Sequence, residues 1–307
     1  KILLINYHKM IKKKCPICEN DSTNIIYNRN LPKTIDESNY AGRKPPDYYH
    51  YEMVRCTKCK ILYANSIYDE VTIEKLYNDS DFTYSEEIPG LKLTYEYCLK
   101  KAQNFLAHKN SFLDIGCGNG FMLEVANNNG WENVVGIEPS LNAIKEANPK
   151  FKKMIINKVF NSSSLKKESF DLVFCAMILE HVSDINKFLD QIKWILKPGG
   201  IILAITHNEK HFLSRILKNK HPIINDEHAY VFSPNSLKKI FQKHNYKIKE
   251  ISNLKNIYTI KYWLKMIPGF KRFKTYLIWI LENTKIFKSM VGLKAGNIFI
   301  IAQKPKR

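Results

Sequence analysis

A glycine cluster between an apolar strand and a helix constrains this chain more than any other feature of its sequence. Residues 111–115 are largely apolar, Gly116, Gly118 and Gly120 follow, and residues 121–125 begin an amphipathic helical pattern. Glycine adopts turns that are closed to residues with a Cβ and lets the backbone pass close under a ligand. In an open α/β sheet, ligands bind at the carboxyl ends of the strands, where such a turn lies. The pattern therefore predicts a cofactor site.

Two acidic residues indicate which kind of cofactor fits. Residues 133–137 form a second apolar strand that ends in Glu138, whose carboxylate is placed to accept hydrogen bonds from two ribose hydroxyls. A nicotinamide dinucleotide calls for G-x-G-x-x-G, but Phe121 occupies the place of the third glycine. Asp114, two residues before Gly116, would repel a pyrophosphate and could instead orient an ammonium group. We therefore expect a cofactor that combines adenosine with an amino acid.

The pattern D-x-G-x-G-x-G resembles the first motif of the class I S-adenosylmethionine-dependent methyltransferases. Further blocks continue the resemblance in the order of that family, at residues 136–140, 169–174, 179–182 and 196–200. Together they cover roughly residues 108–250. The resemblance implies an α/β fold with a doubly wound, Rossmann-like sheet of seven strands, the last one antiparallel.

The resemblance also implies S-adenosylmethionine as the cofactor. Phe160 and Asn161 are assigned to its adenine end by their distance before residues 170–171. The full set of expected cofactor-binding residues is Asp114, Gly116, Cys117, Gly118, Gly120, Glu138, Pro139, Phe160, Asn161 and Ala176.

Apolar strands alternate with amphipathic helices beyond the glycine cluster. Strands are expected at 111–115, 133–137, 171–176, 200–206, 246–252 and 297–303, and helices near 120–129, 141–147, 184–196 and 234–244. Such alternation at short spacing is typical of a parallel sheet covered by helices on both faces. Pro198 and Gly199 end one helix, because proline cannot continue it and glycine accepts positive φ.

Two C-x-x-C turns among the cysteines predict a metal site. The pairs are Cys15 with Cys18 and Cys56 with Cys59. In a reducing cytosol such pairs are metal sites more often than disulfides. Two turns complete a tetrahedral four-cysteine zinc site with no open coordination position, so we expect the zinc to be structural. A redox role is the alternative, and it is disfavoured because neither pair opens a helix in a βαβ unit.

These features divide the chain into segments. We expect an N-terminal tail at 1–14, a zinc-binding module at 15–65 with strands at 48–55 and 60–63, a helical connector at 66–107 and the methyltransferase domain at 108–307. Within that domain, a helical insert at 254–295 is divided by Pro268-Gly269 and carries apolar and basic residues on opposite sides. We expect a lid; the alternative is a helix pair that rests on anionic lipid as a peripheral membrane contact.

The chain is strongly basic, with a formal net charge of +19 at pH 7 over 307 residues. Such a charge favours an anionic partner. Lysine supplies most of it, however, and asparagine and isoleucine are also abundant, as in chains from AT-rich genomes. We therefore favour a compositional origin of the positive charge over a surface that binds nucleic acid. No window of about 20 uncharged apolar residues and no secretion signal is found, so we expect a cytoplasmic protein.

The combination of a zinc module with this core resembles bacterial methyltransferases of sugar and polysaccharide pathways. That resemblance implies a small-molecule or glycan acceptor: a sugar, a nucleotide-sugar or a glycan. Because no further domain follows residue 307, as it does in relatives that methylate carbon, we expect oxygen or nitrogen as the acceptor atom.

Two other functions are weighed against this one. A zinc-ribbon methyltransferase of ribosomal or transfer RNA bases would fit the charge. Residues 176–179 read Ala-Met-Ile-Leu, however, where enzymes that attack exocyclic base amines commonly carry an Asn-Pro-Pro-Tyr-like tetrapeptide. A scaffold with an inactive cofactor fold is disfavoured by the intact Asp114, Gly116, Gly118 and Glu138.

Transfer to an alcohol needs a group that removes its proton, and histidine has a suitable pKa. His181 follows the strand at 171–176, His207 follows the strand at 200–206, and His228 stands two residues before Tyr230. All are expected at the cofactor edge of the sheet, and a structural role is an equal alternative for each histidine. We rank His228, with Tyr230, first because it lies where acceptors bind in the resembling family.

Overall fold

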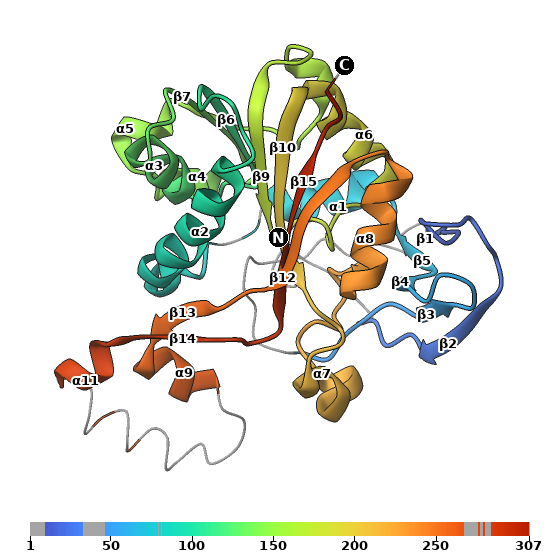
Figure 1. The fold of residues 1–307 in the computed structure, drawn as a ribbon. Helices are drawn as coiled ribbons and strands as arrows, with labels where there is room; N and C mark the ends of the chain where they lie inside the picture. The colour runs from blue at the N-terminus through green and yellow to red at the C-terminus, as the bar shows by residue number, and fades with distance from the viewer. Residues whose placement is uncertain are drawn as a thin grey trace.

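The computed structural model of the chain describes residues 10–32, 47–78, 80, 82–266, 276, 279 and 284–306. A seven-stranded mixed sheet forms its centre (Figure 1). The strand order is β12 (Lys247–Asn253), β15 (Asn297–Gln303), β10 (Leu196–His207), β9 (Phe170–Ala176), β6 (Ser111–Ile115), β7 (Asn133–Ile137) and β8 (Ile155–Ile156). β15 is antiparallel to both neighbours, and the other pairs are parallel. The predicted seven-stranded sheet with an antiparallel last strand is confirmed.

Helices cover both faces of this sheet. Side chains alternate between the two faces along each strand, so both faces present apolar residues that pack against helices. Phe112 and Leu172 belong to the core of one face, and Leu113 and Val173 to the core of the other. Figure 1 shows the first group of helices to the left of the sheet and the second to its right. The first comprises α2 (Ile88–Gln103), α3 (Phe121–Asn128), α4 (Leu141–Lys145) and α5 (Pro149–Lys152), and the second α6 (Ile185–Ile195) and α8 (Pro234–Lys243).

Local sequence signals fix where these helices begin and end. The Asp184 carboxylate accepts hydrogen bonds from backbone N–H groups in the first turn of α6, which is a standard N-terminal cap. Ser233 caps α8 in the same way, with Pro234 at the first helical position. After α6, β10 begins directly at Leu196 and not at residue 200 as predicted, and Gly199, with φ of 80°, lies within it where the pairing with β9 is irregular between Leu196 and Ile201.

A four-stranded antiparallel sheet combines strands from two distant parts of the chain. Its order is β11 (Tyr230–Val231), β4 (Leu62–Ala64), β3 (Met53–Cys56) and β2 (Thr23–Tyr27), and β1 (Met10–Lys12) pairs with β5 (Ser66–Tyr68). The strand expected at 48–55 is shorter than predicted, because Tyr48 has φ of 62° and regular pairing starts only at Met53. Backbone pairing thus binds the N-terminal segment to the region around residue 230.

The insert at 254–295 begins and ends as a β-hairpin, which corrects the expectation of helices throughout. β13 (Asn256–Thr259) pairs with β14 (Met290–Leu293), and the Ile257 N–H donates to Thr94 Oγ1 of α2 at 2.8 Å. The described helical parts are α9 (Ile260–Met266) and α11 (Lys285–Lys288). The predicted division at Pro268-Gly269 lies outside the described residues, so the lid and the membrane contact stay predictions.

The remaining elements frame the sheet. They are α1 (Glu70–Asn78), α7 (Phe212–Leu217) and the short 3₁₀ turns η2 (Ser85–Glu87), η3 (Ser162–Ser164) and η4 (Lys218–Lys220). One continuous apolar core contains Cys56 and Tyr63 of the N-terminal segment together with Leu113 of the large sheet and Leu179 of the turn after β9. The segment boundaries stay predictions. Within the described part of the chain, no helix is long and apolar enough to cross a lipid bilayer.

Candidate active site

A cavity of about 830 Å³ opens at the carboxyl ends of β6, β7 and β9. Its walls come from the glycine turn after β6, the end of β7, the turn at 157–161, the turn after β9 and one side of α1. The volume lies within the roughly 300–1,000 Å³ typical of small-molecule and cofactor sites. The predicted cofactor region is therefore a formed cavity.

The glycine turn has the backbone geometry that only glycine adopts readily. Gly116 and Gly118 have φ of 72° and 54°. A Cβ on Gly116 would lie 2.3 Å from Ile178 Cδ1, and one on Gly118 would lie 2.3 Å from Tyr84 Oη. The conformation disfavours other residues, and the ends of the Ile178 and Tyr84 side chains would have to move to admit a Cβ. Gly120 begins α3 and does not line the cavity.

Glu138 lies at the tip of β7 and connects the two halves of the cavity wall. Its Oε2 accepts the Gly118 N–H at 2.8 Å, and its Oε1 accepts the Ser140 N–H at 2.8 Å. Burial raises the pKa of Glu138, while these two N–H groups act to lower it. The carboxylate is therefore fixed at the position where the sequence predicts ribose hydroxyls to bind.

Asp114 is buried in the cavity wall at the end of β6. Burial, and after it the neighbouring Glu138, raise its pKa well above the usual range. A cationic group in the cavity would reverse this shift, which is the chemistry expected for the ammonium of an amino-acid cofactor.

The other predicted cofactor residues lie on the same walls. Phe160 packs edge-on against Phe188 of α6, with ring centroids 5.5 Å apart. Asn161 Oδ1 accepts the Ser163 N–H and caps η3. These residues line the cavity together with Cys117, Pro139 and Ala176. The cavity thus contains every predicted cofactor residue except Gly120.

His181 is the predicted histidine that reaches the cavity. Its Nδ1 lies 2.7 Å from the Tyr77 hydroxyl of α1 and 3.7 Å from Glu227 Oε2. Tyr77 and Glu227 also line the cavity. Neither was among the predicted site residues, although Glu227 directly precedes His228 and Tyr77 falls in a tyrosine-rich stretch. This trio combines a titratable ring, a hydroxyl and a carboxylate at one wall.

The other predicted catalytic residues lie behind that wall. His228 is buried, its Nδ1–H donates to the Ile223 carbonyl at 2.9 Å, and its ring stands edge-on to His181 at 4.6 Å. His207 Nδ1 lies 3.0 Å from Asn297 Oδ1. The Tyr230 hydroxyl donates to the Ser183 carbonyl, and burial raises the pKa of this tyrosine. None of the three lines the cavity.

Glu180 lies at the centre of the histidine group. Thr206 Oγ1 donates to its Oε2 at 2.9 Å, and His207 Nε2 lies 3.7 Å from its Oε1. Among the described residues, no hydrogen bond reaches Oε1. One ligand atom each of Glu180, His181 and His228 lies within 4.8 Å of the others, so these side chains are close enough to share a cation.

Glu180 is expected to make stability depend on pH. Burial raises its pKa from 4.5 to about 7, so the folded chain keeps this carboxyl neutral where the unfolded chain ionises it. Its stabilising contribution is complete below pH 4.5 and is lost as the pH rises through 7. Between these two pH values, the free energy of unfolding of the wild type should fall by roughly 3 kcal/mol relative to that of Glu180→Gln. Denaturant titrations of both proteins at pH 5 and pH 8 measure this difference, and a constant difference would refute it.

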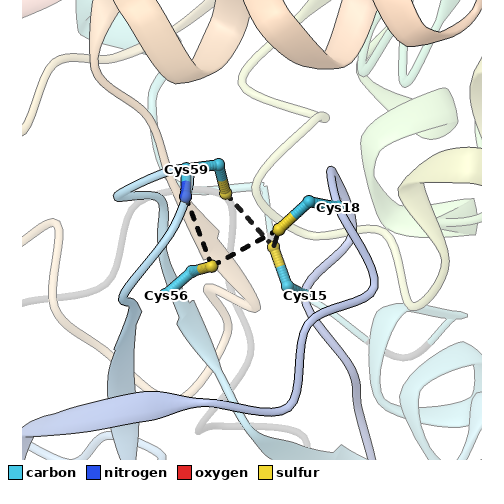
Figure 2. A group of neighbouring side chains, drawn as sticks. All are labelled: Cys15, Cys18, Cys56 and Cys59. Carbon is cyan, nitrogen blue, oxygen red and sulfur yellow. Dashed lines mark hydrogen bonds between the residues drawn. The ribbon is translucent and has the colours of Figure 1, made fainter.

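The two C-x-x-C turns bring their four sulfurs together (Figure 2). Sγ–Sγ distances are 3.2 Å for Cys15–Cys59, 3.5 Å for Cys15–Cys18 and 3.5 Å for Cys18–Cys56. Tetrahedral zinc with Zn–S bonds of about 2.3 Å holds its sulfurs about 3.8 Å apart, close to these values. The residues present therefore fit a four-cysteine metal site.

Backbone groups of the second turn support the charged form of one sulfur. Cys56 Sγ accepts the Cys59 N–H at 3.4 Å. Burial alone would raise the pKa of Cys56, but hydrogen bonds from the Cys59 and Lys58 amides and from neighbouring thiols lower it to about 6. Burial raises the pKa of Cys15 and Cys59, so these sulfurs stay protonated until a cation binds.

Comparison with known proteins agrees with this site. Residues 91–251 match the family model described as a methyltransferase domain. A ubiquinone biosynthesis O-methyltransferase of Nitrobacter winogradskyi is 34% identical over 100 residues, which are 31% of this chain and 38% of that protein. A mitochondrial enzyme of the same name from Dictyostelium discoideum is 26% identical over 207 residues, 60% of this chain and 64% of that protein. The chain thus spans about two fifths of the length of the first of these relatives.

Solved structures with a similar fold are more distant. A SAM-dependent methyltransferase from Archaeoglobus fulgidus is 20% identical, with a TM-score of 0.47, over 72% of this chain and 98% of that one. One from Aquifex aeolicus is 17% identical, with a TM-score of 0.45, over 77% and 99%. These likenesses are too weak to add to the assignment. The family model covers just over half of the 307 residues, including the glycine turn and Glu138, and the chain belongs to the methyltransferase domain family.

Proposed function

We propose that this chain transfers a methyl group from S-adenosylmethionine to the oxygen of a hydroxyl acceptor. The observation that carries the proposal is His181, which stands at the wall of the cofactor cavity with its Nδ1 2.7 Å from the Tyr77 hydroxyl. A histidine in that place is able to take the proton of an attacking hydroxyl. The names of the curated relatives, which are O-methyltransferases, support oxygen over nitrogen.

The cofactor is held by the residues that the cavity brings together. Glu138 would accept the ribose hydroxyls, Asp114 would accept the ammonium group, and the turn at Gly116 would pass beneath the methionine part; all three residues line the cavity. Phe160 and Asn161 contact the adenine. When bound, S-adenosylmethionine supplies an electrophilic methyl group on a sulfonium. The chain contributes mainly position, because an in-line displacement gains most from alignment of the reacting atoms.

Proton removal is the second contribution of the chain. In the tautomer that carries its hydrogen on Nδ1, His181 donates to the Tyr77 oxygen, and Nε2 is left to accept the acceptor's proton. Glu227 Oε2, 3.7 Å from Nδ1, stabilises the imidazolium that forms. We propose His181 rather than His228 as the base, because His181 lines the cavity whereas His228 is buried and does not line it.

The acceptor class is the finer part of the proposal. A sugar, nucleotide-sugar or glycan acceptor is our prediction from the sequence. The curated relatives give it no support, since their names refer to ubiquinone biosynthesis. The two kinds of hydroxyl differ in acidity: a phenol ionises near pH 10, whereas a sugar hydroxyl is a weaker acid and depends more on a base.

The test is methyl transfer from labelled S-adenosylmethionine to two probes, a nucleotide-sugar and a catechol. His181→Gln should lower the rate by roughly 10²- to 10⁴-fold on the accepted probe, because general-base catalysis contributes about that much. His207→Gln is the matched control, because His207 adjoins Glu180 but does not line the cavity. Unchanged transfer by His181→Gln would show that His181 is not the base. Methylation of neither probe but of an RNA base nitrogen would overturn the hydroxyl acceptor.

A further inference from the structure

The four-cysteine cluster is connected to the catalytic wall through a shared sheet. Cys56 ends β3, and the turn that contains Cys59 leads into β4. β4 in turn pairs with β11, in the register Tyr63 with Tyr230 and Leu62 with Val231. β11 is only two residues long. So short a strand holds its place only if its neighbour is fixed.

A chain of backbone hydrogen bonds continues from β4 to the catalytic histidine. Ala64 N–H donates to the Ala229 carbonyl at 2.8 Å, and Ala229 N–H donates to the Glu180 carbonyl at 2.7 Å. Glu180 directly precedes His181, and Ala229 directly follows His228. The segment 226–231, with Glu227 at the cavity wall, is therefore held between the small sheet and the turn after β9.

A side-chain bridge runs parallel to these backbone bonds. The Arg55 guanidinium binds Glu209 through Nη1–Oε1 at 3.1 Å and Nη2–Oε2 at 2.7 Å. Nη1 also donates to the Lys60 carbonyl of the second cysteine turn at 2.9 Å. The Glu209 N–H donates to the Phe232 carbonyl, immediately after β11. Because the Glu209 side chain is only 5% exposed, this bidentate pair is better shielded from water than a surface salt bridge.

The first cysteine turn is attached to the large domain as well. Lys243 of α8 donates from Nζ to the Pro16 carbonyl at 2.8 Å, and Pro16 lies between Cys15 and Cys18. Each turn is therefore tied by a cation to the part of the chain that carries the cavity. These contacts, together with the shared apolar core, connect the cluster to the catalytic wall.

We propose that a metal ion on Cys15, Cys18, Cys56 and Cys59 orders the segment 226–231, with Arg55 as a positioning residue that transmits this order to the wall beside His181. The ion fixes the turn between β3 and β4, since it would join the sulfurs of that turn to those of Cys15 and Cys18, which otherwise meet them only through thiol contacts of 3.2 and 3.5 Å. A fixed turn keeps β4 and Arg55 in register with β11 and Glu209. The inference extends the proposed function, but it concerns the order of the chain and is tested without any acceptor.

Hydrogen–deuterium exchange of the zinc-loaded full chain tests the proposal. Chelation should speed exchange of the Ala229 and Tyr230 amides by about tenfold or more, while amides of β6 and β7 keep their rates. Arg55→Ala, which keeps the four cysteines, should speed the same two amides with zinc still bound. Lys210→Ala is the matched control, because Lys210 contacts Glu209 at 3.6 Å but not the cysteine turns, and it should change nothing.

Three outcomes would overturn the proposal. Equal protection of 226–231 in loaded and chelated protein would show that the ion does not order it. Equally faster amide exchange in β6, β7 and 226–231 would show that chelation unfolds the chain globally. Wild-type exchange in Arg55→Ala would remove Arg55 as the positioning residue. A failure to bind S-adenosylhomocysteine, measured in parallel by calorimetry, would count against the proposed function and leave the exchange result standing.

Discussion

Glu138→Ala is expected to bind S-adenosylhomocysteine about 1–3 kcal/mol more weakly than the wild type, roughly 5- to 150-fold in Kd. The proposed ribose contacts are charge-assisted hydrogen bonds in a buried site. Water cannot readily replace a lost acceptor there, so its loss lowers the free energy of cofactor binding. The substitution also leaves the Gly118 and Ser140 N–H groups without their acceptor, so the glycine turn loses a support. Equilibrium dialysis with labelled cofactor measures the change.

Glu138→Gln serves as the matched control for this prediction. The amide keeps one oxygen able to accept a hydrogen bond and nearly the same volume, but it loses the charge. Its affinity should fall between that of the wild type and that of Glu138→Ala. If Glu138→Ala binds as tightly as the wild type, Glu138 is not a cofactor ligand and the site needs a different assignment.

Cys56→Ser is expected to abolish zinc binding and to unfold the N-terminal segment. Protein purified without chelator should contain one zinc ion per chain, and the variant should contain almost none. Small zinc domains bind their ion with about 10–16 kcal/mol, which matches or exceeds the roughly 5–15 kcal/mol that stabilises ordinary domains. Elemental analysis gives the metal content, and a thermal melt shows whether an early transition separates from the main one.

Cys98→Ala is the control for the cysteine prediction. Cys98 is buried in α2, away from the cluster, so this variant should keep its zinc and lose stability only through a small change in packing. A wild-type protein without bound metal would refute the zinc site. A Cys56→Ser variant that keeps its metal and its melting curve would show that the ion is not held by this cluster.

Local patterns made most of the large sheet predictable. Strands β6 and β7 follow from apolar runs that end in glycine or an acidic residue, and β9 follows from the apolar run after Asp171. Helix boundaries at α6 and α8 follow from Asp184 and Ser233. The cofactor residues follow from the same pattern, because the carboxyl ends of parallel strands share one edge. Each of the two cysteine turns is likewise recognised from its own short spacing. The metal site then requires only that these two turns come together.

Features that depend on distant pairing were not predictable from local patterns. β11 is two residues long, and only its pairing with β4 makes it a strand. The β13–β14 hairpin likewise depends on packing against α2. Where each histidine lies relative to the cavity depends on the fold in the same way. Burial and the carbonyl partner of His228 are set by distant segments, and Tyr77 comes from a helix about 100 residues before His181, so the ranking of the histidines as bases stays a prediction.

The most direct test of the central claim is calorimetric titration of the wild-type chain with S-adenosylhomocysteine and, separately, with NAD. The cavity with Asp114 beneath the glycine turn and Glu138 at the tip of β7 predicts one saturable site for S-adenosylhomocysteine and no heat of binding for the dinucleotide. Binding of NAD, or the absence of binding by S-adenosylhomocysteine, would contradict the account.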